Sequence, residues 1–380
     1  MHIQCIFIDD SARFSIKEDT SAGFAPNYRP AAQDNDLVDA ITRLDERIAA
    51  FSVHTEWLTA LRREAYIANA QASASIEGNP LTIEESQDVL RRHETRSLRR
   101  PRPDEREILQ HYQYFQHLQR LNLREPPDLT VAEIESTHRN LLTRVVDSAK
   151  RPGELRGPQN QAYVSVGRLE CTPPSRVAAE LGALHSWYYS DALALPHAVR
   201  IAIWFSEFES IHPFRDGNGR VGRALTHRLL YSDGLSNSIF VALDRPFSQD
   251  RQGYYRALAS VHQTGRLDSW VRHFLEALKD AYETSLKVLV GLGGIPTGLT
   301  GAPRAVMEYL LRSGRSDISV AELVFHLGRY KPITITVALQ RLAKDFGFVV
   351  HNGVAGRGSR YQIGPAIQRL LSPPIDAARL

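Results

Sequence analysis

The chain has 380 residues, a length typical of two or three domains, and an apolar fraction of 43%, which is ordinary for a soluble globular protein. Its net charge of only +3 gives no argument that the whole chain binds nucleic acid or a membrane surface. The two cysteines, Cys5 and Cys171, lie in unrelated contexts, which excludes a disulfide framework and a cysteine-rich metal site. No signal-peptide pattern and no membrane-length apolar run occur, so we expect a cytoplasmic protein without a membrane partner.

Helices are predicted for much of the first 150 residues. Apolar residues recur at helical spacing over 35–61, and a second helix is predicted over 64–76, followed by the stop signals Gly78 and Pro80. Thr82 and Glu85 fit a capping box that opens the next helix. Further helices are expected over 105–121 and 131–146. The basic stretch 91–106 is interpreted as a solvated loop, the alternative being a surface for an anionic partner.

The pattern of the sequence changes after residue 150. Residues 162–167 alternate like a short pair of strands, and helices return over 177–189. The segment 196–211 is apolar nearly all round, which is typical of a helix buried at the centre of a domain. A Gly-rich segment follows directly, and the next helix is predicted over 221–231.

The C-terminal part is predicted to be a separate unit, joined by a Gly-rich linker over 288–301. Helices are expected over 303–311, after the capping box of Ser319 and Glu322, and over 333–344. Strands over 348–351 and 361–363, with a turn at Asn352-Gly353, complete a pattern that resembles a winged helix-turn-helix. The predicted domains are an N-terminal region (1–104), a core (105–287), the linker, and this winged-helix-like unit (302–380).

The segment from His212 to Arg223 holds the residue types that phosphate chemistry needs. Its glycines let the backbone approach a ligand, and the helix that follows offers free N–H groups and a positive dipole end, which together make an anion site. Arg220 and Arg223 lie three apart on that helix, so both can face the anion. Asp216 is placed to hold Mg²⁺ through oxygen, and His212 has the ordinary pKa that best suits proton abstraction near neutral pH.

The same segment resembles the signature of the Fic family: His, any, Phe, any, Asp or Glu, Gly, Asn, Gly, Arg, any, any, Arg. The resemblance implies a mainly helical fold, with a Fic helical core and a short β-hairpin flap, that transfers AMP from ATP to a Ser, Thr or Tyr hydroxyl of a protein. It implies that His212 is the general base, that Phe214 anchors the loop and that Asp216 binds Mg²⁺. The ATP phosphates would be held by Gly217, Asn218, Gly219, Arg220 and Arg223.

Two further segments extend the resemblance. The run from Gly153 to Arg156 and the strands after it look like the flap of the family, which holds the target protein by strand addition. The flap residues would be Val164, Ser165 and Val166. Tyr254 and Tyr255 resemble a pair that lies near the adenine and ribose, the alternative being aromatic core packing.

Ser73 and Glu77 fit the inhibitory motif of the family, which reads Ser or Thr, three residues, Glu, then Gly or Asn. On the helix predicted over about 64–78 the two side chains share a face. The resemblance places Glu77 against Arg223, where an ion pair would occupy the arginine that the γ-phosphate of ATP needs. Weak basal activity is therefore expected, the alternative being an ordinary surface glutamate at a helix end.

Two competing interpretations remain open. Within the family, relatives transfer phosphocholine, UMP or phosphate, or remove AMP from a target, in which case Glu77 would orient a water. In another class, the C-terminal unit would make the protein a DNA-binding regulator, and many winged helices instead bind protein or form a homodimer. DNA phosphates would then be contacted by Lys331, Arg341, Lys344, Arg357 and Arg360.

Overall fold

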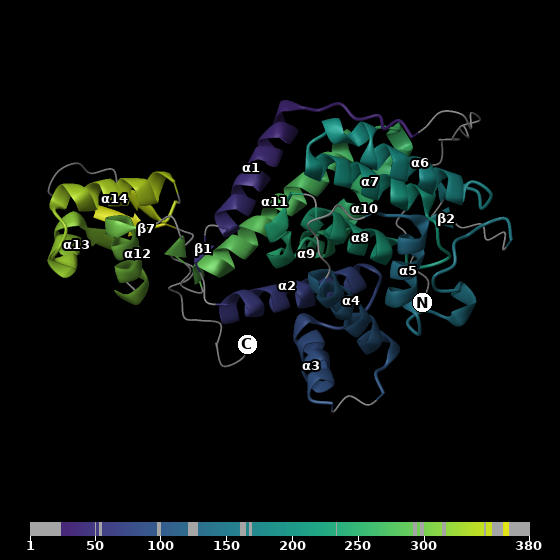
Figure 1. Cartoon of the computed structure of the whole chain (residues 1–380), viewed down its shortest axis with the longest axis horizontal. Coiled ribbons are helices and arrows are strands. Elements are labelled where there is room, and N and C mark those ends of the chain that lie inside the picture. Colours follow the sequence, from purple (N-terminus) through teal and green to yellow (C-terminus); the bar gives the residue numbers. More distant parts are fainter. Residues whose placement is uncertain are drawn as a thin grey trace. The chain divides into compact units, whose positions relative to one another are not determined.

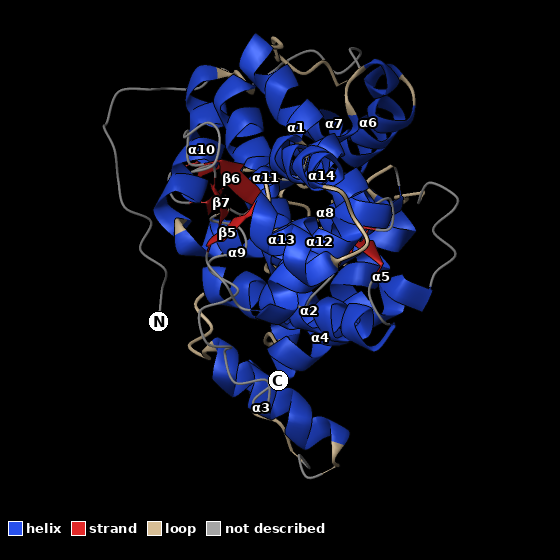
Figure 2. Ribbon diagram, turned by 90° about the vertical axis from the view of Figure 1, so that its left-hand side faces the viewer, coloured by secondary structure: helices blue, strands red, loops and turns tan. Residues whose placement is uncertain are grey.

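The computed structural model describes residues 24–49, 51–52, 55–96, 100–120, 128–159, 165–166, 169–232, 234–291, 295–296, 300–313, 317–345, 347–351 and 360–364. The chain divides into two compact units, one formed from 1–45 and 62–282 and the other from 46–61 and 283–380. Helices make up most of the regular structure, and the strands drawn in red are short (Figure 2). Among the helices of these described ranges, none has both the length and the apolar character needed to cross a bilayer.

The large unit is a helical assembly, shown in purple to green in Figure 1. Helices α1, α2 and α11 contribute residues to both units. The helices are α1 (Ala32–Ala49), α2 (Thr55–Ile76), α3 (Ile83–Glu94), α4 (Pro103–Arg120), α5 (Val131–Leu142), α6 (Val177–Tyr189), α7 (His197–Ile211), α8 (Asn218–Ser232), α9 (Asp244–Gln249), α10 (Arg251–Thr264) and α11 (Asp268–Gly291). Short 3₁₀ turns are η1 (Ser148–Lys150), η2 (Asp191–Ala194) and η3 (Ser236–Phe240), and a hairpin pairs β2 (Ser165–Val166) with β3 (Leu169–Glu170).

Helix α7 forms the centre of this unit, as its all-round apolar sequence predicts. It packs on α6, α8 and α10 (Figure 1). Trp204 stacks on Phe208 with ring centroids 5.2 Å apart, and Phe205 stacks on Trp270 of α11 at 5.4 Å. The Trp270 indole donates to the carbonyl of Ala202, so the core also satisfies its polar group. The ends of α7 and α8 are thereby fixed by a dense apolar interior.

Several predicted helices have different bounds in the structure: the helix expected over 64–76 begins at Thr55, and the helix expected over 131–146 ends at Leu142. The run over 35–61 is not one helix: α1 ends at Ala49, and Phe51–Ser52 form β1, which pairs with β4 (Ile295–Pro296). Pairing between segments so distant in sequence cannot be detected from local periodicity. Helix α8 begins at Asn218 rather than at residue 221, so the second half of the Gly-rich segment forms its first turn.

The small unit combines three helices with an antiparallel sheet. Helices α12 (Gly301–Ser313), α13 (Val320–Leu327) and α14 (Pro332–Lys344) pack together, and the sheet order is β5 (Asp317–Ser319), β7 (Arg360–Ile363), β6 (Val349–His351). The capping box of Ser319 and Glu322 is confirmed, as is that of Thr82 and Glu85 in the large unit. Helix α11 continues to Gly291, so the first residues of the predicted linker are helical. The predicted turn at Asn352-Gly353 lies outside the described residues.

Asp45 joins three parts of the large unit. Its Oδ1 accepts hydrogen bonds from the Tyr282 hydroxyl at 2.7 Å and the Asn237 backbone N–H at 3.0 Å, and its Oδ2 accepts from the Asn237 side chain at 3.0 Å. The residue is 7% exposed. A buried carboxylate with several donors stabilises strongly, because removing it leaves those donors unpaired.

We expect Asp45→Ala to lower the free energy of unfolding by about 2–4 kcal/mol, since Tyr282 and Asn237 would lose a charged acceptor inside the protein. Urea denaturation followed by circular dichroism measures the change. Asp39→Ala, which removes an exposed carboxylate from the same helix, serves as the control and should shift stability by less than about 0.5 kcal/mol. Equal denaturation midpoints for the two variants would contradict the role of Asp45.

Candidate active site

The loop between α7 and α8 begins with a backbone that is held in an unusual conformation. His212 follows the last residue of α7 and has a φ of 51°, in the left-handed region. Arg156, which is 1% exposed, donates from Nε to the His212 carbonyl at 2.8 Å and from Nη2 to the Ile211 carbonyl at 2.9 Å. A left-handed non-glycine residue persists only where its surroundings fix it, and here Arg156 supplies those contacts.

Phe214 and Asn218 close the loop on itself. The Asn218 side-chain oxygen accepts from the Phe214 N–H at 2.8 Å, and its side-chain nitrogen donates to the Phe214 carbonyl at 2.9 Å. Phe214 is 0% exposed and stacks on His138 of α5 with ring centroids 3.7 Å apart. Both polar atoms of the Asn218 side chain thus contact the loop backbone, and its predicted contact with the nucleotide stays a prediction. Its role in this arrangement is to shape the loop.

The His212 ring lies at the end of α7 with its Nδ1 3.3 Å from the Glu209 carbonyl. Burial lowers the pKa of His212 to about 4, so the imidazole is neutral at pH 7. If Nδ1 carries the proton and donates it to that carbonyl, Nε2 keeps a free lone pair. This is the form of histidine that can accept a proton from a substrate.

Arg220 and Asp216 lie together at the start of α8. Arg220 donates from Nη1 to Glu107 Oε1 at 2.7 Å and from Nη2 to Asp216 Oδ1 at 2.9 Å. Arg220 is buried, whereas the Asp216 side chain is 37% exposed. His138 supports the same loop, since its Nε2 lies 2.9 Å from the Asp216 carbonyl and its Nδ1 accepts from the Gly153 N–H at 2.6 Å.

The carboxylate of Asp216 suits a magnesium ion that is held mainly by phosphates. Across the described ranges, no group of three or more His, Cys, Asp or Glu side chains is arranged to hold a metal. Magnesium usually keeps several waters and binds through one or two carboxylates together with substrate phosphates. A single accessible acid beside the first turn of α8 therefore fits this ion.

Arg223 is the most heavily bonded cation of the site. It donates from Nε to Ser73 Oγ at 2.9 Å, from Nη2 to the Ser73 carbonyl at 3.0 Å and to Glu77 Oε1 at 2.8 Å, and from Nη1 to the Tyr254 hydroxyl at 3.3 Å. The Arg223 side chain is 2% exposed and that of Glu77 is 23% exposed. Burial acts to raise the pKa of Glu77, but Arg223 and then Arg220 outweigh it and hold the pKa below its usual value.

Glu77 is brought to this position by the end of α2. The helix stops at Ile76, and Gly78 takes a φ of 99°, which glycine adopts without strain. A Cβ added to Gly219 would lie 2.7 Å from Glu77 Oε1 and 3.0 Å from Arg223 Nη1. The Glu77 carboxylate therefore lies against the first turn of α8, where the free N–H groups and the helix dipole favour an anion.

The two tyrosines predicted near the nucleotide have different surroundings. Tyr254 is 1% exposed and packs against Phe247, with ring centroids 4.9 Å apart, so it belongs to the core as well as to the Arg223 cluster. Tyr255 is half-buried, and its hydroxyl donates to the Ile76 carbonyl at 3.3 Å. Of the flap residues, Ser165 and Val166 form β2, whereas Val164 lies outside the described residues.

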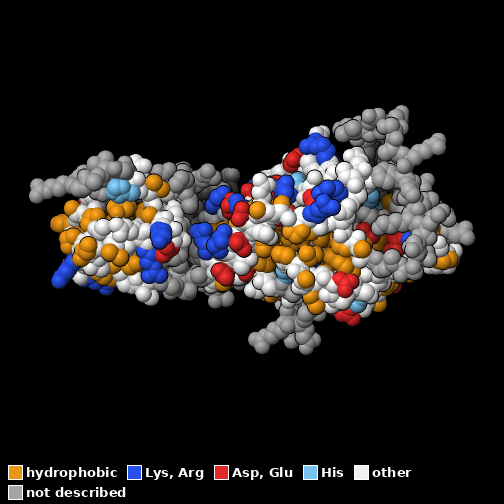
Figure 3. Space-filling view, turned by 90° about the horizontal axis from the view of Figure 1, so that it is seen from above, with side chains coloured by type: hydrophobic (Ala, Val, Ile, Leu, Met, Phe, Trp, Pro, Cys, Tyr) orange, Lys and Arg blue, Asp and Glu red, His pale blue; other side chains and the backbone are white. Residues whose placement is uncertain are grey.

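The cations predicted to contact DNA are only partly available. Arg360 pairs with Asp317 at 2.6 Å and with Glu322 at 3.4 Å, and Arg341 lies 3.6 Å from Asp345. Lys331 and Lys344 are exposed, and Arg357 lies outside the described residues. Figure 3 shows hydrophobic side chains on the surface of this unit, and the large exposed ones include Phe325, Ile333 and Val337.

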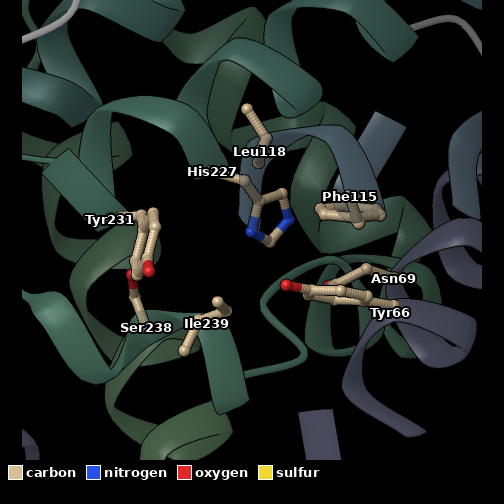
Figure 4. Close-up of a pocket in the computed structure, with 8 residues that line it drawn as sticks. All are labelled: Tyr66, Asn69, Phe115, Leu118, His227, Tyr231, Ser238 and Ile239. Atoms are coloured by element: carbon tan, nitrogen blue, oxygen red, sulfur yellow. The ribbon is translucent and has the colours of Figure 1, made fainter. Parts of the chain in front are cut away.

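A small cavity lies one helical turn from the Arg223 cluster (Figure 4). Asn69 of α2 and His227 of α8 line it, and they stand four residues from Ser73 and Arg223 respectively. Its volume is about 20 Å³, enough for one water molecule. The side chains around it are those of Tyr66, Asn69, Phe115, Leu118, His227, Tyr231, Ser238 and Ile239.

Sequence reasoning missed several residues that support the site. Arg156 lies in the segment compared with the flap, but nothing in that pattern showed that it holds the His212 backbone. His138, Glu107 and Glu209 are isolated polar residues on helices, and only the fold brings them to the loop. The one available signal was their polarity on otherwise apolar helix faces, which alone does not identify a partner.

The family model described as "Fic/DOC family" matches residues 128–230, which include this loop and the helices on either side of it. Solved Fic structures have the same fold. The match to a Fic family protein from Desulfovibrio desulfuricans G20 covers 90% of this chain and 99% of that protein's chain, with a TM-score of 0.58 and 22% sequence identity. Fic-1 from C. elegans covers 68% of this chain and 73% of its own, with a TM-score of 0.57 and 22% identity.

The curated relatives carry the name protein adenylyltransferase Fic. The relative from Drosophila willistoni is 29% identical over 252 residues, which is 65% of this chain and 46% of the relative. The relative from Drosophila virilis is 30% identical over 249 residues, which is 64% of this chain and 47% of the relative. The chain thus spans about half the length of the curated relatives it matches.

We expect the free energy of unfolding to fall as the pH decreases, and to fall more steeply in the unmodified protein than in His138→Gln. Burial lowers the pKa of His138 to about 4, while the unfolded chain takes up a proton near pH 6.5. The contribution of a neutral His138 to the free energy of unfolding is therefore fully present above about pH 6.5. It is lost as the pH falls toward 4, by up to ~1.4 kcal/mol per pH unit. Urea denaturation at pH 7 and pH 5 should show a smaller difference for His138→Gln than for the unmodified protein.

His117→Gln is the control, because His117 is exposed on α4. This variant should keep the pH dependence of the unmodified protein. The same pH dependence in His138→Gln would show that burial does not hold His138 neutral in the folded protein.

Proposed function

We propose that the protein is an adenylyltransferase that moves AMP from ATP to a Ser, Thr or Tyr hydroxyl of a target protein or of itself. The observation that carries the proposal is the union, in one loop, of a neutral His212 with two buried arginines at the first turn of α8. The names of the curated relatives support the same activity. Because the chain spans about half the length of these relatives, the activity and the target protein are both part of this proposal.

The chemistry follows from the arrangement of the loop. The ATP phosphates would lie against the N–H groups of the first turn of α8, with Arg220 and Arg223 neutralising their charge. Asp216 would hold Mg²⁺, which reduces the charge on the phosphates when bound. The target oxygen forms a bond to the α-phosphorus, the bond to the pyrophosphate oxygen breaks, and His212 Nε2 accepts the hydroxyl proton.

Glu77 would inhibit this reaction by competing for Arg223. Its carboxylate lies 2.8 Å from the guanidinium and beside Gly219, which is the position that an ATP phosphate would take. Two anions at one such site repel each other, so ATP would bind either poorly or in an unproductive orientation while Glu77 is paired. Release of Glu77 would leave the rest of the loop unchanged, since Arg156, His138 and Asn218 fix it independently.

The hairpin of β2 and β3 is the proposed place of the target protein. Its register pairs Ser165 with Glu170 and Val166 with Leu169. A hairpin offers backbone hydrogen-bonding groups to an added strand, which places a target hydroxyl through the main chain rather than through one particular sequence.

We expect Glu77→Gly to raise AMP transfer at least about tenfold and His212→Ala to reduce it by about 10²–10⁴-fold, because one removes the competing anion and the other removes the base. Incubation with labelled ATP and Mg²⁺, followed by gel electrophoresis and intact-mass measurement, reports both effects. A mass gain other than AMP would identify a different transferred group, and loss of AMP from a premodified target would identify the reverse activity.

Glu84→Gly is the matched control, since Glu84 is an exposed carboxylate in the first turn of α3. It should label as the unmodified protein does. Equal labelling by Glu77→Gly and Glu84→Gly would refute inhibition by Glu77, and full labelling by His212→Ala would refute the general base.

A further inference from the structure

Glu209 is a buried acid that the proposed reaction does not use. It lies in the last turn of α7, three residues before His212. Part of the residue reaches solvent, but its Oε1 is buried, and none of the hydrogen bonds among the described residues reaches that atom. A buried carboxylate oxygen without a donor is costly, so its presence beside an active-site loop requires a physical explanation.

The carboxyl of Glu209 occupies space that α8 leaves free. A Cβ added to Gly222 would lie 2.6 Å from Glu209 Oε1 and 3.1 Å from ring carbons of Phe205 and Phe208. Because Gly222 has no side chain, the two helices approach closely and the Glu209 carboxyl fits between them. The acid is therefore held beside Gly222, the residue that directly precedes Arg223, and it cannot turn freely to solvent.

The ionisable groups around this carboxyl come from three elements. They are Arg223 of α8, Tyr254 of α10 and Glu77 after the end of α2. Burial raises the pKa of Glu209 to about 8, the positive charge of Arg223 opposes this rise, and the negative charge of Glu77 reinforces it. Two further ionisable groups lie nearby. His262 Nε2 of α10 lies 3.5 Å from Ser210 Oγ. The charge of Asp244 also acts on Arg223, and Asp244 Oδ1 lies 3.2 Å from His227 Nε2.

We propose that Glu209 is a positioning residue for Arg223. Glu209 keeps its proton while another anion is paired with Arg223, and it releases the proton when Arg223 has no other anion. The proposal rests on the proposed function, in which Glu77 and an ATP phosphate alternate at Arg223. It assigns Glu209 as the acid that holds the guanidinium between these two states.

The charges at the site explain the exchange. While Glu77 is ionised and paired, a second negative charge on Glu209 would be repelled by it, so Glu209 stays protonated. When Glu77 withdraws, Arg223 would lose the carboxylate that is hydrogen-bonded to it while it stays buried, a state that is strongly unfavourable. Ionisation of Glu209 removes that imbalance, and the guanidinium keeps its position for the incoming phosphate.

ATP binding reverses this step. The phosphate brings a new negative charge to Arg223, and repulsion again favours the protonated form of Glu209. One proton is therefore released to solvent when Glu77 withdraws and one is taken up when ATP binds. Over the complete exchange of Glu77 for ATP, the number of protons on Glu209 does not change.

Calorimetry of ATP binding tests the second step. We expect the Glu77→Gly variant, titrated with Mg²⁺ and a non-hydrolysable ATP analogue at pH 7, to take up close to one proton, measured in buffers of different ionisation enthalpy. The affinity should fall by up to about tenfold per pH unit as the pH rises, because the proton must be supplied by solvent. The double variant Glu77→Gly, Glu209→Gln, whose amide resembles the protonated acid, should lose this part of the uptake.

The outcomes separate this inference from the proposed function. Equal proton uptake in the single and double variants would overturn the role of Glu209 while leaving the nucleotide site intact. An absence of analogue binding in both folded variants would instead contradict the nucleotide site itself.

Infrared difference spectroscopy tests the first step without any nucleotide. At pH 7 the unmodified protein should show the C=O stretch of a protonated carboxylic acid, and this band should be absent from both Glu209→Gln and Glu77→Gly. The protonated band persisting in Glu77→Gly, or in Glu209→Gln, would overturn the proposal even if one of the variants binds no analogue.

Discussion

The contacts of the buried Arg223 guanidinium are the interactions on which the arrangement of the candidate site depends. A cation that is 2% exposed must have its hydrogen-bonding and charge requirements met inside the protein. Ser73, Glu77 and Tyr254 meet them in the structure, and they come from α2, from the residue after α2 and from α10. One side chain on α8 therefore joins the end of α2 to α10, which lie far apart in sequence. In the proposed function, a nucleotide that needs this cation must replace one of its partners.

Most of the surrounding loop is fixed without reference to Arg223. Arg156 holds the carbonyls at the end of α7, Asn218 closes the loop on Phe214, and His138 supports it from α5. None of these contacts involves Arg223 or Glu77, so we expect them to persist whichever anion is paired with Arg223. The loop is therefore held independently of Glu77, the partner that exchanges with a phosphate in the proposed function. Preorganisation of this kind reduces the reorganisation required at the moment of reaction.

The helical fold and the loop from His212 to Arg223 could both be predicted from the sequence, because they depend on local patterns. The apolar helix before His212, the capping boxes and the spacing of Arg220 and Arg223 are all readable within short windows. The pairing of β1 with β4, the start of α8 at Asn218 and the partners Glu107, His138 and Arg156 are not, since each depends on contacts between distant segments. Asn218 shows the limit well: its position in the motif was evident, but the target of its side chain was decided by the fold of the loop.

The cavity between α2, α4 and α8 affects the volume of the protein. Tyr66 and Ser238 each direct a buried hydroxyl group without a hydrogen bond from the described residues, so this part of the interface is less closely packed than the aromatic core around Trp270. Compression favours the arrangement of a protein with the smaller volume. The cavity lies beside the part of α2 that precedes Ser73, so loss of this volume would be felt first by the helix that supplies Ser73 as a partner of Arg223.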